Sequence, residues 1–143
     1  MITFQNDLKV KAPVSEVYNF LARLENFPSW NYAVSEVRNL HQKNEQGKDL
    51  YGVFRHTTGP KYEEGYIKSF NEDEQLVMVV SGGWFSYEME YNLKEENSYT
   101  LMSNVARIYP SKVSFLPLQL AKHQLQRAVS QNLHVLKEKL EKF

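Results

Sequence analysis

The chain has 143 residues, and its 17 Lys and Arg are balanced by 17 Asp and Glu, so the formal net charge is zero. This length suits one domain with a real core, and the neutral balance gives no overall field to attract nucleic acid or an anionic membrane. The absence of cysteine excludes disulfides, thiol catalysis and thiolate metal sites, and it is compatible with a reducing cytosol.

The N-terminal residues lack the basic start and apolar stretch of a signal peptide. The longest purely apolar run, residues 76–80, is far shorter than the ~20 residues that a membrane-spanning helix needs. We therefore expect a cytoplasmic protein without membrane insertion, with one domain over residues 1–143.

The first element is predicted to be a strand over residues 2–10, and Pro13 separates it from a helix. Proline suits the opening turn of a helix, where its missing N–H costs little. The apolar residues that follow recur at helical spacing: Val14, Val17, Tyr18, Leu21 and Leu24. Residues 26–31 contain Pro28 and are predicted to form a short second helical turn or a loop.

Residues 33–109 carry the signals of strands and tight turns. Turn-forming residues near 44–47, 59–60, 71–74, 82–83 and 95–98 divide this stretch into about six strands. The clearest strand alternates, with Phe85, Tyr87, Met89, Tyr91 and Leu93 on one face and Ser86, Glu88, Glu90 and Asn92 on the other. Strict alternation indicates one buried and one wet face, as in an antiparallel sheet.

Residues 114–142 are predicted to form one long amphipathic helix. At ~100° per residue, its apolar stripe contains Leu118, Ala121, Leu125, Val129, Leu133, Leu136 and Leu140. A helix of this length needs a large apolar surface to lie on, and the preceding strands can supply one. We therefore expect an α+β fold in which a curved, seven-stranded antiparallel sheet wraps around the helix and leaves an interior between them.

Two motifs resemble the START-like superfamily, also called SRPBCC or Bet v 1-like. Residues 10–21 (VKAPVSEVYNFL) and 26–31 (NFPSWN) are similar to the family's opening phrases APxxxVWxxLxD and xxxPxW. Residues 132–141 (NLHVLKEKLE) are similar to its closing phrase xLxxLKxxLE. Together with the strand count, the resemblance covers nearly the whole chain and implies the helix-grip fold, with two short helices after the first strand.

For function, the resemblance implies a small hydrophobic ligand of lipid, polyketide or quinone-like type, bound or transported in a cavity between the sheet and the C-terminal helix. Some members of the family are cyclases, aromatases or hydrolases, and others resemble coenzyme Q-binding proteins or ribosome-associated toxins. Two alternatives therefore stay open: an enzyme of the polyketide cyclase/dehydratase type, and a protein-interaction module with a filled core.

Tyrosines on the clearest strand are the first candidates for ligand contacts. The alternation predicts that Tyr87, Met89 and Tyr91 face the interior. Tyrosine presents an apolar body with a polar tip, as pockets for small molecules often do. Ordinary core packing explains the same pattern equally well.

An amide on the long helix is the second candidate. Asn132 lies within the apolar stripe, near Leu125 and Val129, and a buried amide without a partner costs on the order of 1–3 kcal/mol. We expect its partner to be a ligand or, alternatively, a tyrosine hydroxyl, strand backbone or trapped water. Asn104 shares a face with several apolar residues and would place a second amide inside. Trp30 is expected to cap the interior, mainly as a core anchor.

The remaining candidates depend on which face of a strand points inward. Phe54 and His56 share one face, and Arg55 lies on the other. An inward Arg55 would clamp an anionic ligand, and an inward His56 would serve as an acid or base near neutral pH. Tyr66 belongs to a strand of equally undecided orientation.

No catalytic constellation is predicted. Glu63 and Glu64 are adjacent, so on a strand they point to opposite faces and cannot form a carboxylate pair. His123 and His134 are eleven residues apart, and at ~1.5 Å per residue along a helix they cannot share a metal ion. We therefore predict no metal, no cofactor and no catalytic residue, and expect a binding protein rather than an enzyme.

Overall fold

The computed structural model describes residues 1–56, 62–83, 85–110 and 118–141. The elements in chain order are β1 (Ile2–Val10), α1 (Val14–Ala22), the 3-10 helix η1 (Leu24–Ser29), β2 (Val34–Lys43), β3 (Asp49–Arg55), β4 (Tyr62–Asn71), β5 (Gln75–Ser81), β6 (Phe85–Glu96), β7 (Tyr99–Pro110) and α2 (Leu118–Leu140). Both short helices, the strands between them and α2, and the long helix agree with the predicted order.

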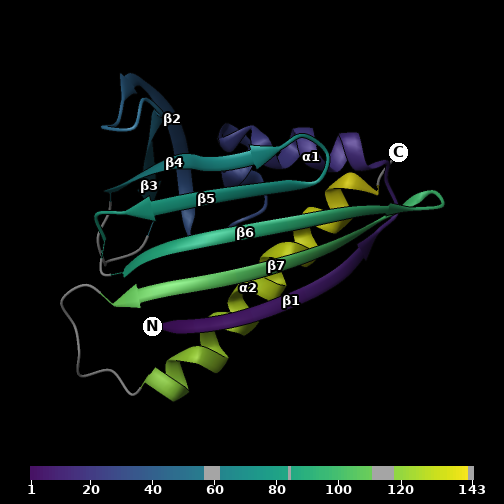
Figure 1. Ribbon diagram of the computed structural model, residues 1–143. Coiled ribbons are helices and arrows are strands. Elements are labelled where there is room, and N and C mark those ends of the chain that lie inside the picture. Colours follow the sequence, from purple (N-terminus) through teal and green to yellow (C-terminus); the bar gives the residue numbers. More distant parts are fainter. Residues whose placement is uncertain (57–61, 84, 111–117, 142–143) are drawn as a thin grey trace.

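The strands form one seven-stranded antiparallel sheet in the order β1-β7-β6-β5-β4-β3-β2. Figure 1 shows that the sheet bends, because β2 runs steeply across the direction of β6. Only the pairing of β1 with β7 joins strands that are far apart in sequence. The predicted α+β helix-grip architecture is confirmed.

The tight turns coincide with the residues that the sequence singled out. Asp73 and Asn97, in the β4–β5 and β6–β7 turns, have φ angles of 63° and 57°. Asp and Asn tolerate this left-handed region better than other residues with side chains. The expected break at residues 59–60 and the expected helix start at residues 114–117 lie outside the described residues.

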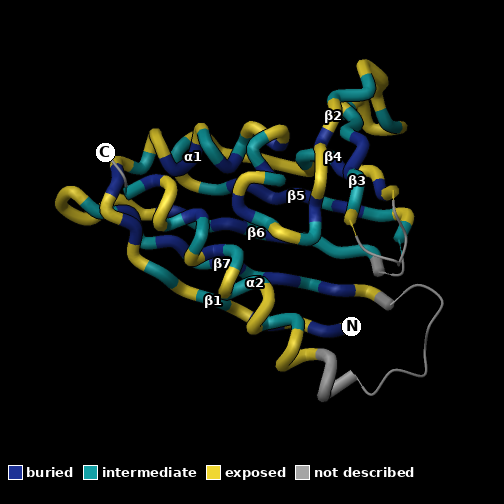
Figure 2. Tube along the Cα trace, turned by 180° about the vertical axis from the view of Figure 1, so that it is seen from behind, coloured by how far each residue is buried: buried dark blue, intermediate teal, exposed yellow. Residues whose placement is uncertain are grey.

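The helices lie on one face of the sheet, which we call the inner face. Leu21, Phe27 and Trp30 of the α1–η1 region meet Met78 and Tyr91 of the sheet there. α2 crosses obliquely beneath the sheet and ends beside α1 (Figure 1). Figure 2, seen from behind, shows buried stretches along β5, β6 and β7. No helix in the described part of the chain combines the length and hydropathy that crossing a membrane requires.

The strand register places the core on the inner face. Met89 pairs with Met78 and Ala106, and Tyr91 pairs with Leu76 and Asn104. Opposed residues of an antiparallel sheet point to the same side, so each row crosses several strands. The α2 residues that complete this core are Leu133, Leu136 and Leu140, all buried.

The opposite, outer face is polar along its centre. Glu88 lies between Lys68 and Arg107, at N···O distances of 2.8 and 3.0 Å, and Arg107 also meets Glu90 at 3.1 Å. These ion pairs are partly covered at Glu88, Glu90 and Arg107 and most exposed at Lys68. They explain why the polar half of the β6 alternation needs no covering layer.

Candidate functional site

A polar cluster occupies the inner face at the end of the sheet remote from α1. Tyr87 pairs with Val80, Val80 with Gly65, and Glu63 with Val53, so Glu63 and Tyr87 share the inner face. Arg55 follows Val53 on the same side of β3. The register therefore settles the orientation that the sequence left open, and it brings Arg55, Glu63 and Tyr87 together.

Arg55 connects the other two members of the cluster. Its Nε donates to the Glu63 carboxylate in an ion pair, and its Nη2 donates to the Tyr87 hydroxyl oxygen at 2.7 Å. The Glu63 side chain is 5% exposed and that of Arg55 is 18% exposed. Glu63 therefore lies behind Arg55, and Arg55 and the half-buried Tyr87 form the accessible side of the cluster.

Burial and charge act in opposite directions on these groups. Burial raises the pKa of the Tyr87 hydroxyl well above its usual value, although Arg55 opposes the shift. Burial also disfavours the charge on Arg55, but Tyr87 and Glu63 outweigh it, and the pKa of the guanidinium is raised. At neutral pH Arg55 is therefore a cation and Tyr87 a neutral phenol.

The turn between β5 and β6 closes the cluster from one side. A Cβ placed on Gly83 would lie 2.6 Å from Glu63 Oε2, a separation that side chains do not tolerate. Gly82 has a φ of +101°, which favours glycine for conformational reasons. The glycine pair therefore lets the chain pass directly over the Glu63 carboxylate.

Further along the inner face, a buried amide lies among mainly apolar residues. Asn104 is fully buried, and its Nδ2 donates to the Met89 sulfur at 3.7 Å. Its Oδ1 has no hydrogen-bond partner among the described residues. Tyr91 of β6 pairs with Asn104 and lies beside it. The pKa of the Tyr91 hydroxyl is raised, mainly by burial and further by Tyr87.

Trp30 closes the end of the interior near α1. Its ring makes edge contacts with Phe27 at 4.8 Å and with Tyr91 at 6.5 Å between centroids. A closed cavity of about 10 Å³ remains between η1 and the sheet, lined by Trp30, Met78 and Tyr91 among others. This volume is near the minimum for one water molecule, so Trp30 acts there mainly as a packing residue.

The burial of α2 changes along its length. Leu133, Leu136 and Leu140 are buried, whereas Leu125 and Val129 are only half-buried although they pack against the core. Gln126 ties this half of the helix to β1: it donates to the Gln5 carbonyl at 3.1 Å, and its own carbonyl accepts from Asn6 at 3.4 Å.

Asn132 is also half-buried, and its side chain makes no hydrogen bond to another described residue. Water can reach it in this position, so the full cost of an unpaired buried amide does not apply. Of the two predicted amides, Asn104 is therefore the one that is fully buried with an oxygen that has no hydrogen-bond partner among the described residues.

Three candidate residues lie away from the inner-face set. Phe54 contacts Tyr62 on the outer face, with ring centroids 5.1 Å apart. Tyr66 pairs with Val79, which also places it on the outer face, and His56 is exposed. The physical reason is the β3–β4–β5 register, which turns Arg55 and Glu63 inward and their neighbours outward.

Sequence reasoning missed Glu63 as a site residue. The strand alternates Tyr62, Glu64 and Tyr66 against Glu63 and Gly65, and the first set mixes charge with aromatic rings, so the sequence left its orientation undecided. The inner face of this strand contains Gly65, which pairs with Tyr51 and Val80. The strand's own sequence does not identify this face, because the assignment depends on the strands that it pairs with.

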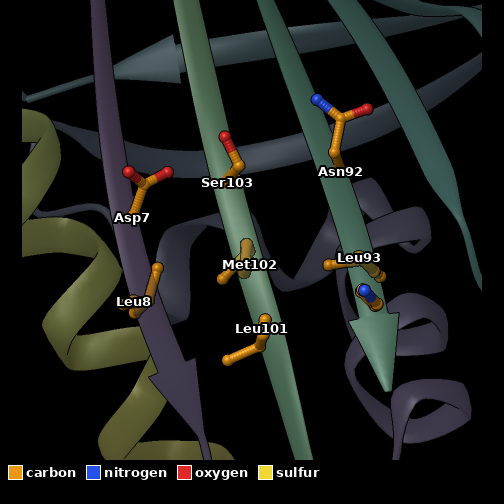
Figure 3. Close-up of a pocket in the computed structure, with 8 residues that line it drawn as sticks. Asp7, Leu8, Asn92, Leu93, Leu101, Met102 and Ser103 are labelled. Atoms are coloured by element: carbon orange, nitrogen blue, oxygen red, sulfur yellow. The ribbon is translucent and has the colours of Figure 1, made fainter. Parts of the chain in front are cut away.

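A groove of about 480 Å³ is also present on the outer face (Figure 3). Asp7, Ser103 and Asn92 form one row across β1, β7 and β6 at its edge. Asp7 accepts from Gln5, and Asn92 is bonded to Gln75 and Glu90. Because the Asp7 carboxylate and the Asn92 amide are already paired, the inner face remains the better candidate site. The described residues contain no group of three or more His, Asp or Glu placed to hold a metal ion.

Comparison with known proteins was consistent with this geometry. The family model described as polyketide cyclase / dehydrase and lipid transport matches residues 1–141. A START superfamily protein from Mycobacterium smegmatis superposes with a TM-score of 0.81 at 14% identity, with 99% of this chain and 98% of that chain covered. The protein XoxI from Bacillus cereus gives a TM-score of 0.74 at 12% identity, with 98% and 96% covered.

A third similar structure is larger than this chain. The di-domain ARO/CYC StfQ from the steffimycin biosynthetic pathway gives a TM-score of 0.73 at 11% identity, with 96% of this chain but 44% of that chain covered. No curated protein sequence matches. At these identities, the structural likeness shows the fold alone.

Proposed function

The chain belongs to the polyketide cyclase / dehydrase and lipid transport family, and on that premise we propose that it binds a small, largely apolar ligand between the inner face of the sheet and α2. Family membership confirms the resemblance drawn from the two terminal motifs. It supports a ligand-binding or cyclase role, and the binding role is the one that the inner face favours.

The observation that carries the proposal is the uneven burial of α2. A helix that only completes a core buries its apolar stripe throughout, as Leu133, Leu136 and Leu140 do. Leu125 and Val129 instead keep exposed surface on a side that packs toward the core. An apolar ligand would cover this surface and gain about 25 cal/mol for each Å² removed from water.

The sheet would supply the matching contacts. Tyr87, Met89 and Tyr91 line one inner strand from the polar cluster toward Trp30, and Asn104 lies beside them. A few polar groups in an apolar surface are typical of small-molecule sites, where they fix orientation. Asn132 would contact the ligand from α2.

The test blocks the proposed site from the helix side. Val129→Trp adds bulk on the half-buried position, whereas Ala128→Trp adds the same bulk on the exposed side of α2. We expect Val129→Trp to weaken binding of the neutral dye Nile red about tenfold or more, and Ala128→Trp to change it less than about twofold. Equal affinities of the two variants would place the dye elsewhere.

Native mass spectrometry of the freshly purified protein, followed by denaturing analysis, provides an independent measurement. A stoichiometric apolar molecule released on denaturation would support the proposal and identify the ligand class.

A cyclase-like activity is the second candidate, and the polar cluster favours it. The Tyr87 oxygen accepts from Arg55, and no described residue accepts the Tyr87 proton. That proton can therefore be donated to a carbonyl group of a bound molecule. If such a molecule is converted, Tyr87→Phe should retain binding and lose turnover. Conversion at an unchanged rate would exclude Tyr87 as the proton donor.

A further inference from the structure

We propose that the polar cluster selects an uncharged carbonyl compound over a carboxylate, and that Glu63 is the residue that excludes anions. This inference rests on the proposed function, because it concerns the polar end of the same ligand site. An inward arginine by itself would suggest an anionic ligand, and the structure gives a reason for the opposite preference.

The charge of Arg55 is already balanced inside the protein. Glu63 forms an ion pair with the guanidinium, and the Tyr87 phenol takes a second N–H. A carboxylate entering beside Arg55 would meet an attraction and a repulsion of similar size, while losing its own hydration. A neutral carbonyl oxygen meets the same donors at a much smaller desolvation cost.

Glu63 is enclosed by its neighbours. Its side chain is 5% exposed, and the backbone of Gly83 passes so closely that not even a methyl group fits between them. Arg55 is more accessible, at 18% exposed. A ligand therefore reaches Arg55 and Tyr87 while the Glu63 carboxylate stays fixed behind them.

The accessible side of the cluster consists of hydrogen-bond donors. A guanidinium carries five N–H groups, of which the contacts to Glu63 and Tyr87 use two. The Tyr87 oxygen accepts from Arg55, and no described residue accepts the Tyr87 proton. The Arg55 and Tyr87 donors are complementary to a ketone-type oxygen, which accepts two hydrogen bonds. The charge of Arg55 is balanced by Glu63.

Two probes of nearly the same shape test this preference: 2-acetylnaphthalene, a neutral ketone, and 2-naphthoate, a carboxylate. Each is titrated into the wild-type protein, Glu63→Gln and Glu64→Gln, with binding followed by calorimetry or fluorescence. Glu63→Gln keeps the side-chain shape and removes the charge. Glu64→Gln makes the same change on the neighbouring exposed residue of the opposite face.

We expect wild-type protein to bind the ketone about tenfold or more tightly than the carboxylate. In Glu63→Gln, the carboxylate should gain about tenfold, because it now supplies the missing counter-charge of Arg55. Glu64→Gln should behave as wild type. An unchanged ratio in Glu63→Gln would overturn the role of Glu63.

The wild-type measurement decides the selectivity even if Glu63→Gln fails to fold. Equal affinity for both probes, or tighter binding of the carboxylate, would overturn the inference and leave the proposed function standing. Binding of neither probe to the wild-type protein would instead count against the proposed function itself.

Discussion

Asn104 is a buried amide whose hydrogen bonds are incomplete among the described residues. It lies on the inner face of β7, between Tyr91 on β6 and Asn6 on β1. It is fully buried, and its Oδ1 is left without a hydrogen bond among the described residues. An unsatisfied buried acceptor costs about 1–3 kcal/mol. A residue kept at that cost in a packed core is more readily explained by ligand recognition than by stability.

Replacing this amide with a similarly branched apolar side chain should stabilise the empty protein. We expect Asn104→Leu to raise the free energy of unfolding by about 1 kcal/mol, because it removes the orphaned acceptor and loses only the weak contact to the Met89 sulfur. Chemical denaturation of the ligand-free protein measures the change.

Asn6→Leu is the matched control, since it is the neighbouring amide in the same row. Asn6 donates to the Gln126 carbonyl, so the same substitution there should lower the free energy of unfolding by about 0.5–1.5 kcal/mol. Destabilisation by both variants would mean that Asn104 is satisfied, for example by an ordered water.

At the scale of the elements, the β5–β6 turn and the β3–β4 pair form one unit. The turn passes close to the Glu63 carboxylate. Glu63 forms an ion pair with Arg55, and Arg55 donates a hydrogen bond to Tyr87 near the start of β6. A Cβ at position 83 would force the Glu63 carboxylate to shift. Local backbone geometry and the charge arrangement of the site are therefore linked through one close approach.

A double-mutant cycle tests this link. Gly83→Ala should destabilise the protein by about 1–3 kcal/mol, because its Cβ would overlap the Glu63 carboxylate. In a Glu63→Ala background, the same substitution should cost at least about 1 kcal/mol less, since the overlapping group is gone. Unfolding of the four proteins in denaturant gives the coupling, and additive effects would show that the close contact is not the cause.

At the scale of the whole molecule, the sheet and helices bury tyrosine hydroxyls in the interior. Burial is the largest cause of the raised pKa of Tyr87, of Tyr91 and of Tyr18, where Glu72 and Asp73 contribute further. The folded state therefore holds these phenol protons more tightly than the unfolded chain does. This difference becomes a dependence of stability on pH in the alkaline range.

Stability should be lost above the unfolded pKa of tyrosine. Above pH ~10 the unfolded chain releases protons that the folded state still binds, so the free energy of unfolding should fall by about 1.4 kcal/mol per pH unit for each such tyrosine. The decline continues until the raised folded pKa is reached. Denaturant unfolding at pH values from ~8 to ~11 measures the slope.

Tyr91→Phe removes one of these hydroxyls and keeps the ring that packs on Trp30. The alkaline slope of this variant should be shallower by about 1.4 kcal/mol per pH unit. A slope identical to that of the wild type would show that Tyr91 does not hold its proton more tightly in the folded state.

Much of the fold follows from local sequence patterns. The alternation of residues 85–93 identifies β6 and its inward tyrosines, and Pro13 with the apolar spacing after it identifies α1. The long apolar stripe identifies α2. These elements could be predicted because periodicity of 2 or 3.6 residues is a property of the chain itself.

The polar end of the site could not be predicted in the same way. A one-residue change in register would exchange Arg55 for His56, and Glu63 for Glu64, on the inner face. The sequence of each strand is compatible with either choice, so Phe54, His56 and Tyr66 remained candidates while Glu63 was missed.

Local patterns are enough to predict the order of the elements, the antiparallel sheet with its long covering helix, and the inward face of β6. The meeting of Arg55, Glu63 and Tyr87, and the full burial of the Asn104 oxygen without a described partner, are visible only in the folded chain. The physical reason is that periodicity is encoded within each strand or helix, whereas the partners of a buried charge or amide are set by strand register and packing between residues far apart in the chain.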